Sequence, residues 1–335
     1  GGLMVGFGGH LMPRITWRKH HWLLFGILLL ALIVRLWNLE YTIHMFIDEL
    51  LIINGVNDIK LNTAQILLPN ANPYTDVFQY FQFLVYQITG PGLTALRVPT
   101  AIFGVLGVAG IYALARQLFS VRVALLSAFL LAVMPVHIHF SRIGINNIVG
   151  GVVATWYFVY LLKGMRHQRL ADFAIAGTLL GLTHYFYEGD RIFFTLFSIL
   201  WLLWMRLFVR RDPLFRMPNR KQLAVFILCF SVVAVPIYHT LWSNHRDVSY
   251  RFNKTRSPDF MLRDRISDFL LDSEIGYIGT PIQRYVQFLA NDDFYQSDYA
   301  FILPYLVPFF LLGFGILLFQ LFSVGGSLLI WWALG

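Results

Sequence analysis

The adjacent carboxylates Asp48 and Glu49 form the residue pair with the clearest potential for chemistry. They lie in the segment TIHMFIDELLIINGVNDIKLN, in which Leu51, Ile52, Val56 and Ile59 recur near helical spacing. This pattern predicts an amphipathic helix on a membrane surface, with Asp48 at its N-terminus. A carboxylate held there could take a proton from a hydroxyl or amine while another substrate stays in lipid. Alternatively, Asp48 is a helix N-cap that accepts a backbone N–H.

Two polar segments further along the chain could bind the rest of a substrate. The first, HIHFSRIGINN at 137–147, offers a guanidinium and amides to phosphate or sugar hydroxyls, although a capped turn at the lipid headgroups explains it equally well. The second, THYFYEGDR at 183–191, crowds four ionisable groups into a short connection, although its tyrosines are typical of an interfacial belt. The predicted substrate-binding residues here are Arg142, Asn146, His184, Tyr185, Tyr187, Glu188 and Arg191.

Two further groups of cations could contact an anionic substrate. Arg35 lies inside the first apolar run, about one turn from its end. It could reach out to the headgroups or pair with a carboxylate of the active cleft. The segment 242–298 mixes cations with acids, and Arg251 and Arg256 are predicted to hold an anionic headgroup. A solvated loop surface explains that segment as well.

Metal, thiol and nucleotide chemistry have little support. His139, His184 and Glu188 could ligate a divalent metal, but no HExxH-like spacing supports them, so a metal cofactor stays open. The single cysteine, Cys229, lies in an apolar run without a disulfide partner. There is no GxxxxGK[ST] motif, and no GxGxxG opens a helix after a strand, so no nucleotide-binding fold is predicted.

The elements that carry these residues are apolar runs. The hydrophobic fraction is 57%, the charged fraction 13% and the mean hydropathy +0.62, against about 45–50% and about 25% in soluble domains. The sequence therefore predicts an all-α polytopic membrane protein with about eight to nine spans. The candidate spans are 22–39, 95–119, 122–138, 147–163, 171–187, 191–209, 222–241 and 299–322, and a ninth run begins near 327.

The charge distribution predicts the orientation. With the N-terminus in the cytoplasm, nearly all charged residues of the short inner loops are lysine or arginine, and Asp172 and Asp212 are their two acidic residues. This asymmetry accounts for the net charge of +8 without nucleic acid as a partner. The loop at 210–221 is then cytoplasmic, whereas 40–94 and 242–298 are long outer loops, which usually carry function. The predicted division is a segment 1–21, a seven-span module 22–241, an outer loop 242–298 and a membrane region 299–335 that we expect to be truncated.

With these residues in view, the chain resembles the GT-C fold glycosyltransferases of the bacterial protein O-mannosyltransferase and aminoarabinose-transferase type, which are glycosyltransferase family 39-like. The likeness rests on Arg35–Leu36 near the end of the first span, on Asp48–Glu49 in the first outer loop, and on the stretch 95–144, which begins ALRVPTAIFGVLGVAG. One departure is that Asn146 and Asn147 stand where relatives often carry an acid.

The resemblance implies a polyprenyl-phosphate-linked sugar as donor, with Asp48 as the catalytic base and Glu49 as its support. It implies an enzyme of the cell inner (plasma) membrane whose active site faces the periplasm or outside. The acceptor could be a protein, a lipid A-like glycolipid or a wall polymer. Two alternatives stay open at this point: a transporter or flippase of lipid-linked saccharides, whose polar residues would lie near mid-membrane, and a non-catalytic membrane scaffold.

Overall fold

The computed structural model describes residues 17–41, 47–60, 77–209, 212, 214–243 and 304–334. Within these ranges the chain is helical and contains no strand, which confirms the predicted all-α class. The predictions for residues 1–16 and 244–303, including those for Arg251 and Arg256, lie outside the described residues. The division into four segments is not tested and stays a prediction.

Most of the helices lie in the predicted apolar runs, and two lie within the segment 40–94, which was predicted to be a long outer loop. The helices are α1 (Trp17–Leu36), α2 (Ile47–Lys60), α3 (Val77–Thr89), α4 (Leu93–Leu118), α5 (Val121–Val133), α6 (Pro135–Ser141), α7 (Asn147–His167), α8 (Leu170–Thr183), α9 (Glu188–Phe208), α10 (Arg220–Ser243), η2 (Pro304–Leu306), α14 (Val307–Phe319) and α15 (Val324–Leu334). Five described helices are long and apolar enough to cross a membrane, and six if the bent pair α5–α6 counts as one span. A count of eight to nine spans stays a prediction.

Three predicted spans differ from the structure. In the described residues, the run 299–322 contains only one α-helix, the short apolar α14, which ends at Phe319. The run 122–138 is not one helix, because α5 and α6 meet at a break with a bend of 61°. Pro135 opens α6, and proline favours a break there because it lacks the N–H and clashes with the preceding turn. The run 171–187 ends early, since α8 stops at Thr183 and residues 184–187 form a turn before α9.

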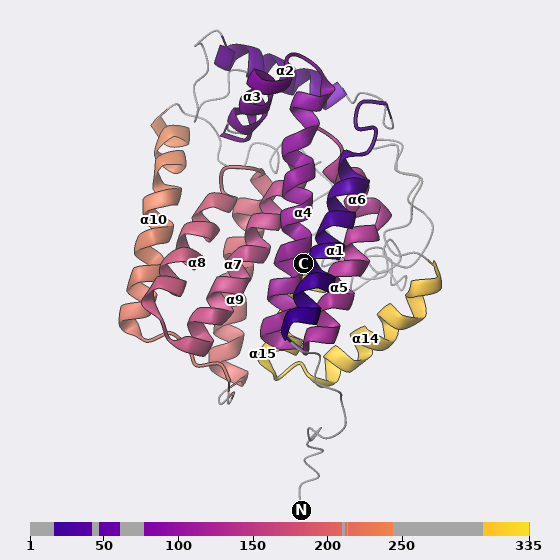
Figure 1. Cartoon of the computed structure of the whole chain (residues 1–335). Helices are drawn as coiled ribbons and strands as arrows, with labels where there is room; N and C mark the ends of the chain where they lie inside the picture. Colours follow the sequence, from indigo (N-terminus) through magenta and orange to yellow (C-terminus); the bar gives the residue numbers. More distant parts are fainter. Residues whose placement is uncertain are drawn as a thin grey trace, which may run out of the picture.

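Successive helices run in opposite directions, which brings the start of α2 and two polar turns to one end of the bundle, here called the α2 end (Figure 1). Helices α2 and α3 and the turns 142–146 and 184–187 lie at this end, whereas the connections 119–120, 168–169 and 214–219 lie at the other (Figure 1). Helix α4 runs between α1, α3, α5 and α7 and contacts all four. Its glycines allow that contact, because a Cβ on Gly107 or Gly110 would meet side chains of α7 within about 3.1 Å.

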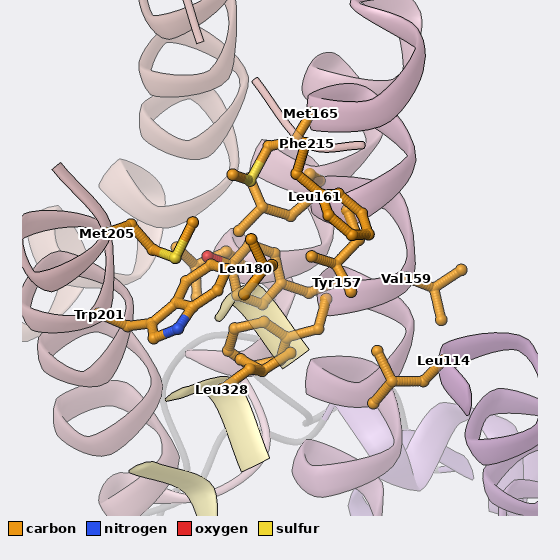
Figure 2. Packing of buried hydrophobic residues seen from close by; sticks show 14 of the residues in the cluster. Leu114, Tyr157, Val159, Leu161, Met165, Leu180, Trp201, Met205, Phe215 and Leu328 are labelled. Carbon is orange, nitrogen blue, oxygen red and sulfur yellow. The ribbon is translucent and has the colours of Figure 1, made fainter. Parts of the chain in front are cut away.

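The apolar core lies toward the other half of the bundle. Tyr157 of α7, Leu180 of α8 and Trp201 of α9 face one another there, and Leu328 of α15 closes the layer (Figure 2). The indole N–H of Trp201 donates to the Ser327 hydroxyl over 3.1 Å, which ties α15 to α9. This packed half supports the helices whose opposite ends carry the polar residues.

Candidate active site at the α2 end

A buried ion pair holds the start of α2 against α4. Glu49 and Arg97 are both fully buried, with Arg97 Nη2 2.8 Å from Glu49 Oε2 and Arg97 Nε 2.9 Å from Glu49 Oε1. This two-point geometry is the one in which a guanidinium fixes a carboxylate most firmly. Arg97 also donates to the carbonyl of Leu39 over 2.9 Å, so it connects α4 with the turn after α1.

The peptide of Gly144 is clamped between α2 and α3. Its N–H donates to Glu49 Oε1 over 2.7 Å, and its carbonyl accepts from Gln82 Nε2 over 2.8 Å. Gln82 is fully buried on α3 and donates also to the carbonyl of Leu96 over 2.9 Å. A Cβ on Gly144 would lie 2.8 Å from Leu96 Cβ and 3.0 Å from Glu49 Oε1, so glycine is needed for this close approach.

Apolar contacts complete the attachment of α2 to the turn 142–146. Ile52 and Val56, from the predicted apolar face of α2, are buried together with Leu96 of α4 and with Ile143 and Ile145 of the turn. The predicted amphipathic helix is therefore present, and its apolar face packs on protein rather than only on a surface. Glu49 thus lies inside a rigid assembly of α2, α3, α4 and the turn.

Asp48 lies beside this assembly and keeps some exposure. It is the second residue of α2, inside the first turn rather than before the helix, and its side chain is half-buried. The partial positive charge of a helix N-terminus favours a carboxylate at this position. The structure therefore presents Asp48 on a fixed backbone next to a buried Glu49, where it can still meet a ligand.

Arg142 is committed to the end of α1. Its Nη1 donates to the carbonyl of Val34 over 2.7 Å, and its Nη2 donates to Trp37 and Asn38 carbonyls over 2.6 and 3.3 Å. Cations are favourable at helix C-termini, where the last carbonyls lack partners. Burial and the nearby Arg97 lower the pKa of Arg142. Its predicted substrate contact is not tested, but these three bonds already occupy much of the guanidinium.

The turn 184–187 forms a second polar cluster, tied mainly to α10 and α9. His184 is buried, with Nδ1 2.7 Å from the Tyr238 hydroxyl and Nε2 2.9 Å from the Thr195 hydroxyl. Burial, and then the charge of Arg191, lower the pKa of His184 to about 4, so the ring is neutral at pH 7. Arg191 itself donates to the carbonyl of His184 over 2.7 Å.

Asn146 connects the two clusters. Its side-chain amide, two residues after Gly144, donates to the carbonyl of Phe186 over 2.6 Å. Tyr185 also points into the protein, since its hydroxyl donates to the carbonyl of Val233 over 2.6 Å. Tyr187 stands immediately before α9, and the side chain of Glu188 lies outside the described part of the structure. The structure thus brings Asp48, Glu49, Arg142 and Asn146 to one end of the bundle with the His184 cluster.

Sequence reasoning missed Arg97, Gln82 and Gly144 as parts of this site. Arg97 stands in an apolar run 48 residues after Glu49, so no spacing indicated the pair. The available signal was that a charged residue inside a predicted span needs a partner. In the described ranges, no three His, Cys, Asp or Glu side chains come together as a metal site.

The comparisons confirm the GT-C fold that was predicted for this helical bundle. The model of the dolichyl-phosphate-mannose-protein mannosyltransferase family matches residues 75–239, close to half of the chain. This range includes Arg97 and both polar turns. No curated protein sequence matches the chain closely enough for comparison.

The chain is also similar in fold to solved archaeal oligosaccharyltransferases. The Archaeoglobus fulgidus enzyme in its apo form has a TM-score of 0.59 at 15% identity, over 95% of this chain and 47% of that one. The enzyme AglB from the same organism, in complex with an inhibitory peptide and a dolichol-phosphate, has a TM-score of 0.60 at 16% identity, over 95% and 47%. This chain therefore spans about half the length of these proteins and shares their fold.

Proposed function

We propose that the chain is the membrane module of a glycosyltransferase that moves a sugar from a polyprenyl-phosphate donor to an acceptor at the outer membrane face. The observation that carries this proposal is the fixed, half-buried Asp48 beside the Glu49–Arg97 pair. The mannosyltransferase family match and the dolichol-phosphate in the AglB complex support a lipid-linked donor. The acceptor peptide tethered to an archaeal relative supports a protein acceptor.

The proposed reaction is one displacement at the anomeric carbon. The acceptor hydroxyl or amide gives its proton to the Asp48 carboxylate as its oxygen or nitrogen bonds to the anomeric carbon. The bond from that carbon to the phosphate oxygen breaks, and the electron pair leaves with the polyprenyl phosphate. The configuration at the anomeric carbon is therefore inverted. Once Asp48 has taken the proton, the buried cations Arg97 and Arg142 outnumber the remaining carboxylate Glu49, so the local field favours the departing anion.

The position of the charges favours an enzyme over the alternatives. A transporter of lipid-linked saccharides would place its polar residues near mid-membrane on broken helices. Here Asp48, Glu49 and Arg97 lie at the α2 end of their helices. In a non-catalytic scaffold, Asp48 would have no role except to stabilise the N-terminus of α2.

A donor panel tests the proposed function. Purified full-length protein in lipid is expected to consume one sugar from a panel of polyprenyl-phosphate sugars, and to leave matched polyprenyl-diphosphate and nucleotide sugars unchanged. Peptide, glycolipid and wall-polymer acceptors would be supplied in parallel, and product configuration would be read by NMR. Retention of configuration would contradict a single displacement. Use of a nucleotide sugar, or no turnover of any donor by folded protein, would refute the proposed donor class.

Cysteine labelling tests which side of the membrane the α2 end faces. We expect the connection 210–221 to be cytoplasmic, but Asn219 is a poor probe because it caps α10 in reciprocal bonds with Gln222. Leu214 in the same connection is 54% exposed, and Ile88 of α3 is 85% exposed. In a Cys229→Ser background, Leu214→Cys should react with an impermeant maleimide only after lysis, and Ile88→Cys should react in intact cells. The reverse pattern would place the α2 end in the cytoplasm.

A further inference from the structure

Arg35 is a buried cation with no donor left for a substrate. It lies in α1, is fully buried, and carries five N–H donors. Each donor has an acceptor in the described structure. These are Ser141 Oγ at 3.2 Å from Nε, the carbonyls of Ala31 and Ala132 at 3.0 and 3.1 Å from Nη1, and the carbonyl of Leu131 and His137 Nδ1 at 3.3 and 2.7 Å from Nη2. A phosphate could bind Arg35 only by displacing one of them.

Two of these acceptors are carbonyls that the break between α5 and α6 leaves open. In an unbroken helix the carbonyls of Leu131 and Ala132 would accept from the N–H groups four residues later. Pro135 has no N–H, and the 61° bend turns the following residue away from the axis of α5. Buried backbone carbonyls need a hydrogen-bond partner from the protein. The guanidinium of Arg35 supplies these bonds in place of the helix.

The same guanidinium also holds the far side of the break. His137 and Ser141 are on α6, and because arginine only donates, His137 must accept through Nδ1 as a neutral ring. The Ser141 hydroxyl donates in turn to the carbonyl of His137. Gly104 of α4 makes room for this arrangement, since a Cβ there would lie 2.5 Å from Ser141 Oγ and 2.8 Å from Arg35 Nε. Arg35 thus bonds α1, α5 and α6 at once.

We propose that Arg35 is a positioning residue, which fixes the direction of α6 at the break and thereby places the Gly144 peptide that holds Glu49. Helix α6 ends at Ser141, three residues before Gly144, so a change in its direction moves that peptide directly. Glu49 accepts from the Gly144 N–H and adjoins Asp48 in the first turn of α2. Arg35 therefore acts on the base through the turn rather than by touching the donor. This inference rests on the proposed function.

Three variants and a matched control test this role in the full chain. Gly104→Ala adds one methyl against Arg35 and Ser141 without removing a charge, Ser141→Ala removes one acceptor, and Arg35→Lys replaces the planar fork by a compact ammonium. Gly26→Ala is the control, because a Cβ on Gly26 of α1 meets nothing within 4 Å. We expect kcat to fall about a hundredfold in Gly104→Ala, as for a misplaced catalytic group, with a smaller loss in Ser141→Ala. The donor KM should stay near the wild-type value.

Opposite results would support a direct phosphate contact. In that case Arg35→Lys would keep most of its kcat, the donor KM would rise, and Gly104→Ala would behave like Gly26→Ala. Hydrogen–deuterium exchange adds a readout that needs no turnover. Amides of residues 142–146 should exchange faster in Gly104→Ala and Arg35→Lys than in Gly26→Ala, and equal exchange would overturn the proposal. If the wild type transfers no sugar, the proposed function fails while exchange still decides the role of Arg35.

Discussion

Asp48→Asn protein is expected to fold and insert normally and to transfer sugar about 10²–10⁴-fold more slowly than the wild type. An amide of the same shape cannot take the acceptor's proton, whereas it can still occupy the first turn of α2. The helix is held mainly by Glu49 and by the buried Ile52 and Val56, which the substitution leaves in place. The measurement is initial rate of transfer with the donor found in the panel, together with membrane abundance and thermal unfolding.

Asp172→Asn is the matched control for this substitution. Asp172 is also an aspartate in the first turn of a helix, but it lies in α8 at the opposite end of the bundle. The Asp172→Asn variant should transfer sugar at the wild-type rate. The comparison then separates the effect of losing a negative charge at a helix start from the effect of losing the base. Wild-type turnover in Asp48→Asn would exclude Asp48 as the base. Its carboxylate would then only stabilise the N-terminus of α2.

Hydropathy was sufficient to predict most of the long helices. Apolar length is set by the membrane, so runs such as 95–119 and 222–241 correspond closely to α4 and α10. The run 122–138 was misread, because it stays apolar across Pro135 and hydropathy does not register the missing N–H. Hydropathy indicates whether a segment lies in an apolar environment, but it does not indicate whether the helix within that segment is continuous.

The partners of the arginines could not be predicted in the same way. The predicted role for Arg142 was to bind phosphate or sugar, but the acceptors observed are backbone carbonyls of Val34, Trp37 and Asn38. Every residue has a carbonyl, so no residue type in the sequence marks one that lacks a partner. The residue types in the sequence indicated the Asp48–Glu49 pair, and the family resemblance implied its roles. The contact between Glu49 and Arg97 could be recognised only from the structure.

Breaking the Glu49–Arg97 pair should have the largest effect on stability. Both side chains are fully buried, so Arg97→Met or Glu49→Gln leaves a buried charge without its partner, at a cost of about 3–5 kcal/mol of unfolding free energy. We expect each single variant to unfold at markedly lower temperature in detergent and to lose transfer. Thermal unfolding followed by intrinsic tryptophan fluorescence, with transfer rates measured below the transition, reports both effects.

The double variant Glu49→Gln/Arg97→Met separates stability from positioning. Removing both charges leaves neither one buried alone, so much of the lost stability should return. Transfer should stay low, because the two-point bond to Arg97 is gone even though the introduced side-chain amide can still accept from the Gly144 N–H. Recovery of both stability and transfer in the double variant would mean that the pair only fills the interior. Recovery of stability alone would mean that the bond to Arg97 holds the start of α2, and with it Asp48, in the position that catalysis needs.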